Sequence, residues 1–226
     1  MIVRRLFHPA TPSKGEIIRA MHAAGFDAVL KRYKDVVEPP DAWPKYLNLD
    51  DWIPVNLQRV RELALDQVRP GARVLDLGCG AGYFLYICQM LGHEVLGVDM
   101  DVLPMFNESC DVLGIPRVIT QIKAFTPLPP LGMLFDYVTA FLICFNNHKS
   151  PELWGPAEWD FFLDDLAARL APGGRVRLEF NREYNGEPYT PELKSFLERR
   201  GADIDSFRVS FTREQLVRSA TEPAAI

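Results

Sequence analysis

The sequence predicts one α/β domain with a doubly wound, mostly parallel sheet, helices on both faces and a small N-terminal helical cap. Three observations support this prediction. Short β-branched or apolar runs alternate with longer helical patterns from residue 73 onward, and a glycine-rich turn follows the first of these runs. The 226 residues are enough for one sizeable core. Alternation of strands and helices leads to right-handed crossovers and a parallel sheet.

The N-terminal part is predicted to be helical. Residues 16–37 repeat apolar side chains every three or four positions, which predicts one amphipathic helix or a pair broken at Gly25. Residues 41–53 are predicted to form a loop, and a further helix follows with Pro54 near its first turn. The aromatic residues of the predicted loop are Trp43, Tyr46 and Trp52.

The rest of the chain supplies the predicted sheet and its helices. The expected strands are 73–77, 94–98, 117–122, 135–142 and 175–180, with a further one at 206–211. The expected helices are 82–91, 102–113 and 156–170, with another beginning near 190. The domain organisation follows as a cap at 1–53, a core at 54–212 and a poorly ordered tail at 213–226.

Composition limits the classes of partner. The formal net charge is −5 and like charges form no long run, which disfavours a large nucleic-acid interface because such an interface needs a basic stripe. No apolar stretch has the length of a membrane span or a signal peptide. The four cysteines form no C-x-x-C pair and suit reduced thiols. We therefore expect a cytoplasmic protein with no membrane contact and of unspecified oligomeric state.

The glycine-rich turn runs from Asp76 to Gly82 in the order Asp-Leu-Gly-Cys-Gly-Ala-Gly. Gly78 suits the positive φ of a tight turn, Gly80 allows a ligand to approach the backbone, and Gly82 lets the next helix pack closely. The helix N-terminus then offers free N–H groups to a polar ligand. The spacing G-x-G-x-G differs from the G-x-G-x-x-G of dinucleotide-binding proteins, so a nicotinamide-dependent oxidoreductase is disfavoured.

This turn resembles the signature of the class I S-adenosylmethionine-dependent methyltransferases, which have a Rossmann-like fold, and the resemblance extends from about residue 70 to 180. It implies that the loop, including Cys79, lies against the methionine and ribose parts of S-adenosylmethionine. It also implies that the carboxylate of Asp76 orients the methionine amino group. S-adenosylhomocysteine would be the product. The segment Leu170 to Val176, with its Pro-Gly-Gly turn, resembles the same family and is expected to be structural.

The next strand ends in Asp99, about 20 residues past the glycines, where a carboxylate can accept hydrogen bonds from both ribose hydroxyls. The resemblance implies that role and places Met100 against the adenine. The alternative interpretation is that Asp99 caps the helix beginning near 102. Family members often carry an adenine-binding aspartate before the fourth strand, but this chain has Ala124 there. Backbone groups near Ala124 and Phe125, or another side chain, are therefore expected to contact adenine.

Residues from Phe141 to His148 leave the carboxyl end of the fourth strand, where open α/β sheets bind ligands. Phe141 is expected to contact the cofactor, and Phe145, Asn146 and Asn147 to face the substrate. The imidazole of His148 suits a general base, although a histidine before Lys-Ser-Pro also suits a solvated loop. Methyl transfer can proceed without a strong base, because the sulfonium is already activated and positioning lowers the barrier.

Two further hypotheses concern the cap and the reaction. Tyr46 and its aromatic neighbours either form a lid over the substrate or dock the N-terminal helices. The four histidines show no metal-ligand spacing, and we expect no metal. The leading function is methyl transfer to an unidentified small molecule. The alternative is a catalytically silent S-adenosylmethionine-binding protein that regulates or scaffolds a partner.

Overall fold

The computed structural model describes residues 10–36 and 43–219, without the side chains of 43, 44, 218 and 219. The strands follow the order β3-β2-β1-β4-β5-β7-β6 in one seven-stranded sheet. The chain divides into two compact units. The first unit comprises residues up to Ala72 together with Cys79–Arg117, and the second comprises Arg73–Gly78 together with the chain from Val118 onward.

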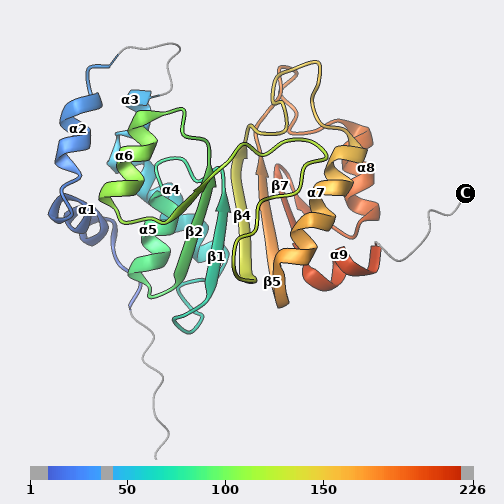
Figure 1. Ribbon diagram of the computed structural model, residues 1–226, viewed down its shortest axis with the longest axis horizontal. Helices are drawn as coiled ribbons and strands as arrows, with labels where there is room; N and C mark the ends of the chain where they lie inside the picture. Colours follow the sequence, from blue (N-terminus) through green and yellow to red (C-terminus); the bar gives the residue numbers. More distant parts are fainter. Residues whose placement is uncertain (1–9, 37–42, 220–226) are drawn as a thin grey trace, which may run out of the picture. The chain divides into compact units, whose positions relative to one another are not determined.

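The first unit is mainly helical (Figure 1). Its elements are α1 (Lys14–Ala23), α2 (Asp27–Tyr33), α3 (Trp43–Tyr46), α4 (Leu49–Glu62), α5 (Tyr83–Met90), β2 (Glu94–Asp99) and α6 (Pro104–Val112). Helix α1 begins with a capping box, in which the Ser13 side chain accepts from the Glu16 N–H and the Glu16 carboxylate accepts from the Ser13 N–H. Gly25 has a φ of 95° and separates α1 from α2. The predicted pair of helices broken at Gly25 is therefore confirmed.

The prediction of a loop at 41–53 is wrong for the residues that the structure describes, because α3 and the beginning of α4 lie there. Helix α4 begins at Leu49, so Pro54 lies in its interior rather than near its first turn. A buried apolar stripe explains the earlier start. The stripe consists of Leu49, Ile53, Leu57 and Val60, which are at most 7% exposed. Packing of this stripe outweighs the loss of one helical hydrogen bond at the proline.

The second unit is built on a sheet. Its elements are β1 (Arg73–Leu77), β4 (Phe135–Ile143), α7 (Pro156–Arg169), β5 (Leu170–Phe180), α8 (Pro191–Arg199), β6 (Asp203–Asp205), β7 (Arg208–Thr212) and α9 (Arg213–Ser219). Strand β3 (Arg117–Ile119) crosses the boundary between the units. β1 pairs with β4 and β4 with β5 in parallel, whereas β7 is antiparallel to both β5 and β6. The predicted doubly wound, mostly parallel α/β fold is confirmed.

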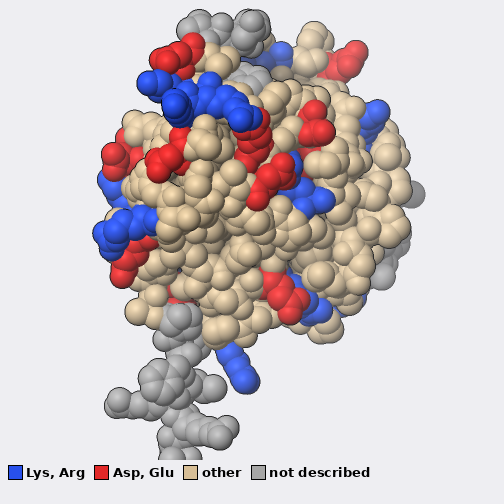
Figure 2. Space-filling model, turned by 60° about the vertical axis from the view of Figure 1, so that its left-hand side comes forward, with Lys and Arg blue, Asp and Glu red and all other residues tan. Residues whose placement is uncertain are grey.

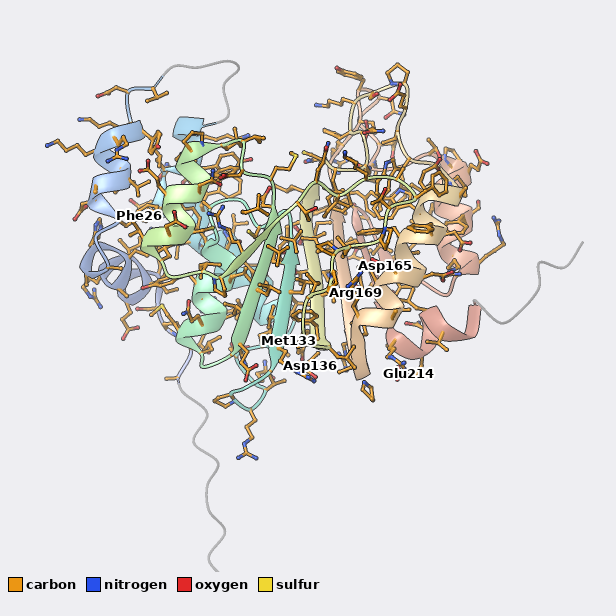
Figure 3. The ribbon with its side chains drawn as sticks, in the orientation of Figure 1. Phe26, Met133, Asp136, Asp165, Arg169 and Glu214 are labelled. Atoms are coloured by element: carbon orange, nitrogen blue, oxygen red, sulfur yellow. The ribbon has the colours of Figure 1, made fainter. Side chains whose placement is uncertain are left out.

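The prediction of a poorly ordered tail is wrong for residues 213–219. These residues form α9, which packs against β5 and α7. Two hydrogen bonds stabilise the start of this helix. The Thr212 N–H donates to the Gln215 Oε1, and the Gln215 N–H donates to the Thr212 Oγ1. Leu216 is fully buried, and the Glu214 carboxylate accepts from the Gly173 N–H (Figure 3). Residues 220–226 lie outside the described part of the chain.

The parallel strands of the second unit set the position of its functional edge. Because β1, β4 and β5 run in the same direction, their carboxyl ends at Leu77, Ile143 and Phe180 lie at one edge of the sheet, at the top of Figure 1. The amino end of β4 lies at the opposite edge, where Asp136 accepts from the Arg73 N–H at 2.8 Å (Figure 3). Segments that follow β1, β4 and β5 are thus candidates for ligand binding.

The turn into β5 has the predicted structural role. Strand β5 begins at Leu170, five residues before the predicted start, and includes Gly173 with a φ of 75°. A Cβ on Gly174 would lie 2.8 Å from the Ala171 carbonyl oxygen and 2.9 Å from that of Phe135. Only glycine fits this contact between two stretches of backbone.

Candidate active site

The glycine turn connects β1 to α5 through three residues with positive φ. Gly78, Gly80 and Gly82 have φ values of 75°, 53° and 75°. A Cβ on Gly80 would touch the Phe106 ring at 3.6 Å. Gly82 is the N-cap of α5, and a Cβ there would lie 2.9 Å from the Cys110 Sγ. The turn therefore follows a path that side chains disfavour, and it exposes backbone groups to a ligand.

Replacing Gly82 by alanine is expected to destabilise the protein by about 1–3 kcal/mol, because the residue needs positive φ and its Cβ would meet Cys110. Thermal unfolding of the ligand-free protein measures the change. Gly114→Ala is the matched control, since Gly114 also has positive φ but no atom within 4 Å of an added Cβ. Equal losses in the two variants would contradict a packing role for Gly82.

Asp99 is held against this turn within the first unit. Its Oδ2 accepts from the Gly80 N–H at 2.7 Å, and its Oδ1 accepts from the Met100 N–H at 2.7 Å. Burial raises the pKa of Asp99 above its ordinary value, whereas these two N–H groups and the charge of Arg117 act in the opposite direction. Each oxygen retains a second lone pair, so the carboxylate can still accept from a diol.

The alternative role of Asp99 as a helix cap is wrong. Helix α6 begins at Pro104, its N-cap is Leu103, and no side chain caps it. The Asp99 carboxylate instead bonds backbone groups of the glycine turn and of its own neighbour. This arrangement ties the end of β2 to the turn.

Asp76 lies near the end of β1 in the second unit and is 3% exposed. The Thr139 hydroxyl, on β4, lies 2.8 Å from the Asp76 Oδ1 and 3.1 Å from the Leu75 carbonyl oxygen. Thr139 is itself fully buried. The hydroxyl thus helps to satisfy a buried carboxylate in the position predicted to orient an amino group.

The other predicted cofactor residues differ in what their side chains offer. Cys79 is buried with its Sγ against Gly97, where an added Cβ would meet it at 2.5 Å, so only its backbone is suited to a ligand. The residues Met100 and Phe125 are 40% and 55% exposed. Phe141 is half-buried on β4. Exposed apolar side chains of this kind are available to cover the face of a flat ligand.

Helix α7 fixes the segment that contains Ala124 and Phe125. The Asp165 carboxylate accepts from the Leu128 N–H at 2.9 Å and pairs with Arg169, also at 2.9 Å (Figure 3). Arg169 donates in turn to the Leu128 and Pro129 carbonyl oxygens. Phe125 has a φ of 53° and its ring meets that of Phe161 edge to face. The segment is therefore anchored a few residues after the predicted adenine contact.

Tyr46 belongs to a cluster of aromatic rings in the first unit. Tyr46 packs on Trp52 with ring centroids 4.7 Å apart and meets Phe106 edge to face at 5.2 Å. Its carbonyl oxygen accepts from the Tyr83 hydroxyl, whose pKa is raised by burial and by the nearby Cys110 thiol. Phe106 adjoins Gly80, so this cluster lies beside the glycine turn. The Trp43 side chain lies outside the described part of the chain.

The predicted substrate residues in the loop after β4 have different surroundings from one another. Phe145 joins a cluster of rings with Trp154, Trp159 and Phe162, at centroid distances of 5.4–6.3 Å. Its role in this cluster is packing. Asn147 has a φ of 58° and donates from Nδ2 to the Glu152 carbonyl oxygen at 3.0 Å. These two side chains shape the loop.

Asn146 is the buried polar residue of this loop, at 3% exposure. Its Oδ1 is buried with no hydrogen-bond partner among the described residues. An unsatisfied buried acceptor opposes folding and commonly marks a position retained for binding.

Replacing Asn146 by leucine is therefore expected to leave thermal stability unchanged or to raise it, because leucine has the same branching at Cγ and removes an unsatisfied acceptor. Asn147→Leu is the control and is expected to destabilise by about 1–2 kcal/mol, since it loses a hydrogen bond and puts leucine at positive φ. A clear loss of stability in the Asn146 variant would show that its amide is needed for the fold.

The imidazole of His148 is within hydrogen-bond distance of a carboxylate that the sequence pattern did not indicate. Its Nδ1 lies 2.8 Å from the Glu183 Oε1, and both side chains are about nine-tenths buried, with exposures of 14% and 13%. The Glu183 Oε2 accepts from the Lys149 N–H at 2.7 Å. The solvated-loop interpretation of His148 is therefore wrong, because the ring is held by a carboxylate on the segment after β5.

Three functional candidates had only weak signals in the sequence. Thr139 lies inside a strand, Phe106 lies inside a helix, and Glu183 is 35 residues from His148. Glu183 does follow a predicted strand, as His148 does, and carboxyl ends of parallel strands share an edge. Their positions after two parallel strands could therefore have indicated that His148 and Glu183 lie close together.

No group of three or more histidine, cysteine or acidic residues arranged to hold a metal is found among residues 10–36 and 43–219. Within the same ranges, none of the helices has the length and apolar character required to cross a bilayer. On the face shown in Figure 2, Lys and Arg are interspersed with Asp and Glu. The described part of that face has no continuous basic stripe of the kind that nucleic acids bind.

Comparison with known proteins supports the predicted family. The chain is 38% identical over 71 residues to a ribosomal protein L11 methyltransferase of Thermus thermophilus, which covers 30% of this chain and 28% of the relative. It is 32% identical over 123 residues to a protein of the same name from Stenotrophomonas maltophilia, covering 54% and 36%. The chain thus spans about a third of the length of these curated relatives.

The comparisons with family models and with solved structures give no further information about the family. No family model matches the chain. A solved structure of magnesium protoporphyrin IX methyltransferase from Synechocystis PCC 6803 is 18% identical, covers 91% of this chain and 99% of its own, and has a TM-score of 0.48. Over part of its length the chain is thus similar to two curated methyltransferases, and it has the glycine turn after β1 and the mostly parallel strand order expected from the resemblance to the class I S-adenosylmethionine-dependent methyltransferases.

Proposed function

We propose that the protein transfers a methyl group from S-adenosylmethionine to a small-molecule acceptor. One observation carries the proposal. The half-buried carboxylate at the end of β2, Asp99, is hydrogen-bonded to the Gly80 N–H inside a turn whose three glycines have positive φ. A carboxylate fixed to a glycine turn suits the two hydroxyls of a ribose, and an acid after the second strand binds ribose in dinucleotide-binding folds.

The residues present fit the cofactor. In this proposal the glycine turn and Cys79 supply backbone groups, and Asp99 accepts from the ribose. Asp76, with Thr139 beside it, receives the cationic amino group, which a buried carboxylate suits. The apolar side chain of Met100 would lie against adenine, whose polar edge is left to backbone groups near Ala124 and Phe125. When bound, the cofactor supplies a methyl group on a sulfonium, which is already activated for displacement.

The acceptor would bind where the segments after β4 and β5 meet the same edge of the sheet. The half-buried Phe141 and the buried Asn146 belong to this edge. A protein acceptor is the second candidate, and the names of the two curated relatives favour it. The interspersed charges seen in Figure 2 and the net charge of −5 favour a nucleic-acid acceptor least.

An assay with S-adenosylmethionine labelled in its methyl group tests the proposal. The full chain is incubated with pools of phenols, alcohols, amines and carboxylates, and separately with ribosomal protein L11. Label in a small molecule, with one equivalent of S-adenosylhomocysteine, is the expected result. Label in the protein alone would replace the small-molecule acceptor by a protein. Tight cofactor binding without transfer to any acceptor would favour the catalytically silent alternative.

A further inference from the structure

We propose that Asp165 and Arg169, two side chains of α7, are positioning residues that make the cofactor site selective for adenine. They would act by holding the backbone at Ala124 and Phe125 in one shape, and they are not proposed to touch the base. This inference rests on the proposed function, in which that backbone meets the polar edge of adenine. It adds the side chains that determine which base the site accepts.

One face of α7 lies against the segment between β3 and β4, within the second unit. Phe161, Asp165 and Arg169 are spaced four residues apart along the helix and therefore share that face. The Phe161 ring meets the Phe125 ring edge to face, with centroids 6.0 Å apart. The two charged side chains, labelled in Figure 3, reach the same segment at Leu128. The helix thus holds the segment both at Phe125 and beyond it.

Asp165 and Arg169 bind both polar groups of the Leu128 backbone. The Asp165 Oδ2 accepts from the Leu128 N–H at 2.9 Å, and Arg169 donates to the Leu128 carbonyl oxygen. Arg169 donates in addition to the Pro129 carbonyl oxygen at 3.0 Å. The guanidinium also makes two hydrogen bonds to the Asp165 carboxylate, at 2.9 and 3.1 Å, and such forked pairs have a defined geometry. The backbone at Leu128 is therefore fixed by two side chains that also fix each other.

Phe125 has an unfavourable backbone conformation in this segment. Its φ of 53° lies in the left-handed region, which a residue with a side chain seldom adopts. Such a conformation persists only where surrounding contacts impose it, and it is concentrated at functional sites. Phe125 is 55% exposed, so its own burial does not account for the conformation. The contacts with α7, at the Phe125 ring and at Leu128, are those that hold it.

The peptide group between Ala124 and Phe125 is the part of this backbone that can serve a ligand. The Thr126 N–H donates to the Lys123 carbonyl oxygen at 3.3 Å, which closes a turn around the two residues. Within residues 10–36 and 43–219, no acceptor is found for the Phe125 N–H. Rotation of φ at Phe125 into the common negative range would turn this peptide plane and move its N–H. The contacts with α7 oppose that rotation.

Adenine and hypoxanthine differ in the groups that such a peptide would meet. Adenine has an accepting ring nitrogen beside a donating amino group, whereas hypoxanthine has a donating ring N–H beside an accepting oxygen. A fixed N–H that donates to adenine faces a second donor in hypoxanthine, and an unpaired polar group of this kind is the basis of strong selectivity. A peptide that is free to turn can present its carbonyl oxygen instead. Fixing the peptide is thus what excludes hypoxanthine.

The test compares the affinities of S-adenosylhomocysteine and S-inosylhomocysteine, in which hypoxanthine replaces adenine, by titration calorimetry of the full chain. The two ligands share their ribose and amino-acid parts, so the ratio of their affinities reports on the base alone. We expect the parent to prefer the adenine compound by about tenfold, as for one hydrogen bond. Arg169→Met, which removes the donors and keeps an apolar stem, is expected to lower this preference several-fold.

Arg200→Met is the matched control. Arg200 is buried and pairs with Asp160 and Asp164 of α7 at 2.8 and 2.6 Å, so it holds the same helix through other residues. Its replacement is expected to lower the thermal stability and to leave the preference for adenine at the parent value. An equal decrease of the preference in the two variants, or no decrease in Arg169→Met, would overturn the positioning role.

Arg169→Lys provides the test if Arg169→Met does not fold. Lysine keeps the charge but lacks the forked donors, so a decreased preference is again expected, and the full parent preference in this variant would overturn the proposal. Failure of the parent to bind S-adenosylhomocysteine would instead contradict the proposed function. Binding of both compounds by the parent with equal affinity would contradict only the selectivity proposed here.

Discussion

Replacing Asp99 by asparagine is expected to weaken binding of S-adenosylhomocysteine by about tenfold to a hundredfold, as for loss of hydrogen bonds to a charged group. The carboxylate accepts from the Gly80 and Met100 N–H groups and is proposed to accept from ribose as well. The amide has one acceptor oxygen and cannot serve all of these donors. Titration calorimetry of the parent and variant measures the change.

Asp101→Asn is the control for this variant. Asp101 is two residues away and exposed, so the same change there is expected to leave affinity unaltered. Equal affinities of the Asp99 variant and the parent would remove Asp99 from the cofactor site. Thermal unfolding of the variant without ligand separates lost binding from lost structure.

The raised pKa of Asp99 gives two opposite dependences on pH. Cofactor binding needs the carboxylate, so affinity is expected to decrease as the pH falls through the raised value. In the ligand-free protein the carboxylate of Asp99 binds a proton more readily in the folded state than in the unfolded chain. The contribution of Asp99 to stability is therefore lost as the pH rises from the ordinary value to the raised one. Both dependences should be absent in Asp99→Asn.

Replacing His148 by glutamine is expected to lower kcat by roughly 100-fold to 10,000-fold, which is the usual contribution of a general base. The effect should be on turnover alone, because the ring is held by Glu183 within the second unit and is not proposed to contact the cofactor. Single-turnover rates with the acceptor identified by the transfer assay, together with S-adenosylhomocysteine affinity, measure it.

His22→Gln is the matched control. His22 is a half-exposed residue of α1 that also pairs with a carboxylate, Asp27, at 2.8 Å. Its replacement should leave kcat unchanged. If His148→Gln retained the parent rate, the reaction would depend on positioning alone, as an activated sulfonium allows.

The sequence was sufficient for those parts of the fold that depend on local pattern. Buried strands such as β1 and helices such as α5 lie where the pattern predicts them, and Gly78 adopts the predicted positive φ, as do Gly80 and Gly82. Pro54 did not indicate where α4 begins. Packing of a buried apolar stripe stabilises the helix although the proline lies in its interior. The helix α9 was missed because its capping pair, Thr212 and Gln215, was not recognised.

The cofactor roles of the candidate residues stay predictions, whereas several side-chain contacts around them were not predicted. Asp99, at the end of β2, is hydrogen-bonded to the Gly80 N–H of the glycine turn. Thr139 and Glu183 were missed because their partners, Asp76 and His148, are distant in the chain, and only pairing of strands brings them together. Phe145 was assigned to the substrate on its position, whereas ring packing accounts for it. Side-chain contacts between segments are set by register, which periodicity does not specify.

The most direct test of the central claim is titration calorimetry of the full chain with S-adenosylhomocysteine and, separately, with NAD. The glycine turn and Asp99 predict saturable binding of one equivalent of S-adenosylhomocysteine and none of NAD. Binding of NAD alone, or of neither compound by a folded protein, would contradict the claim.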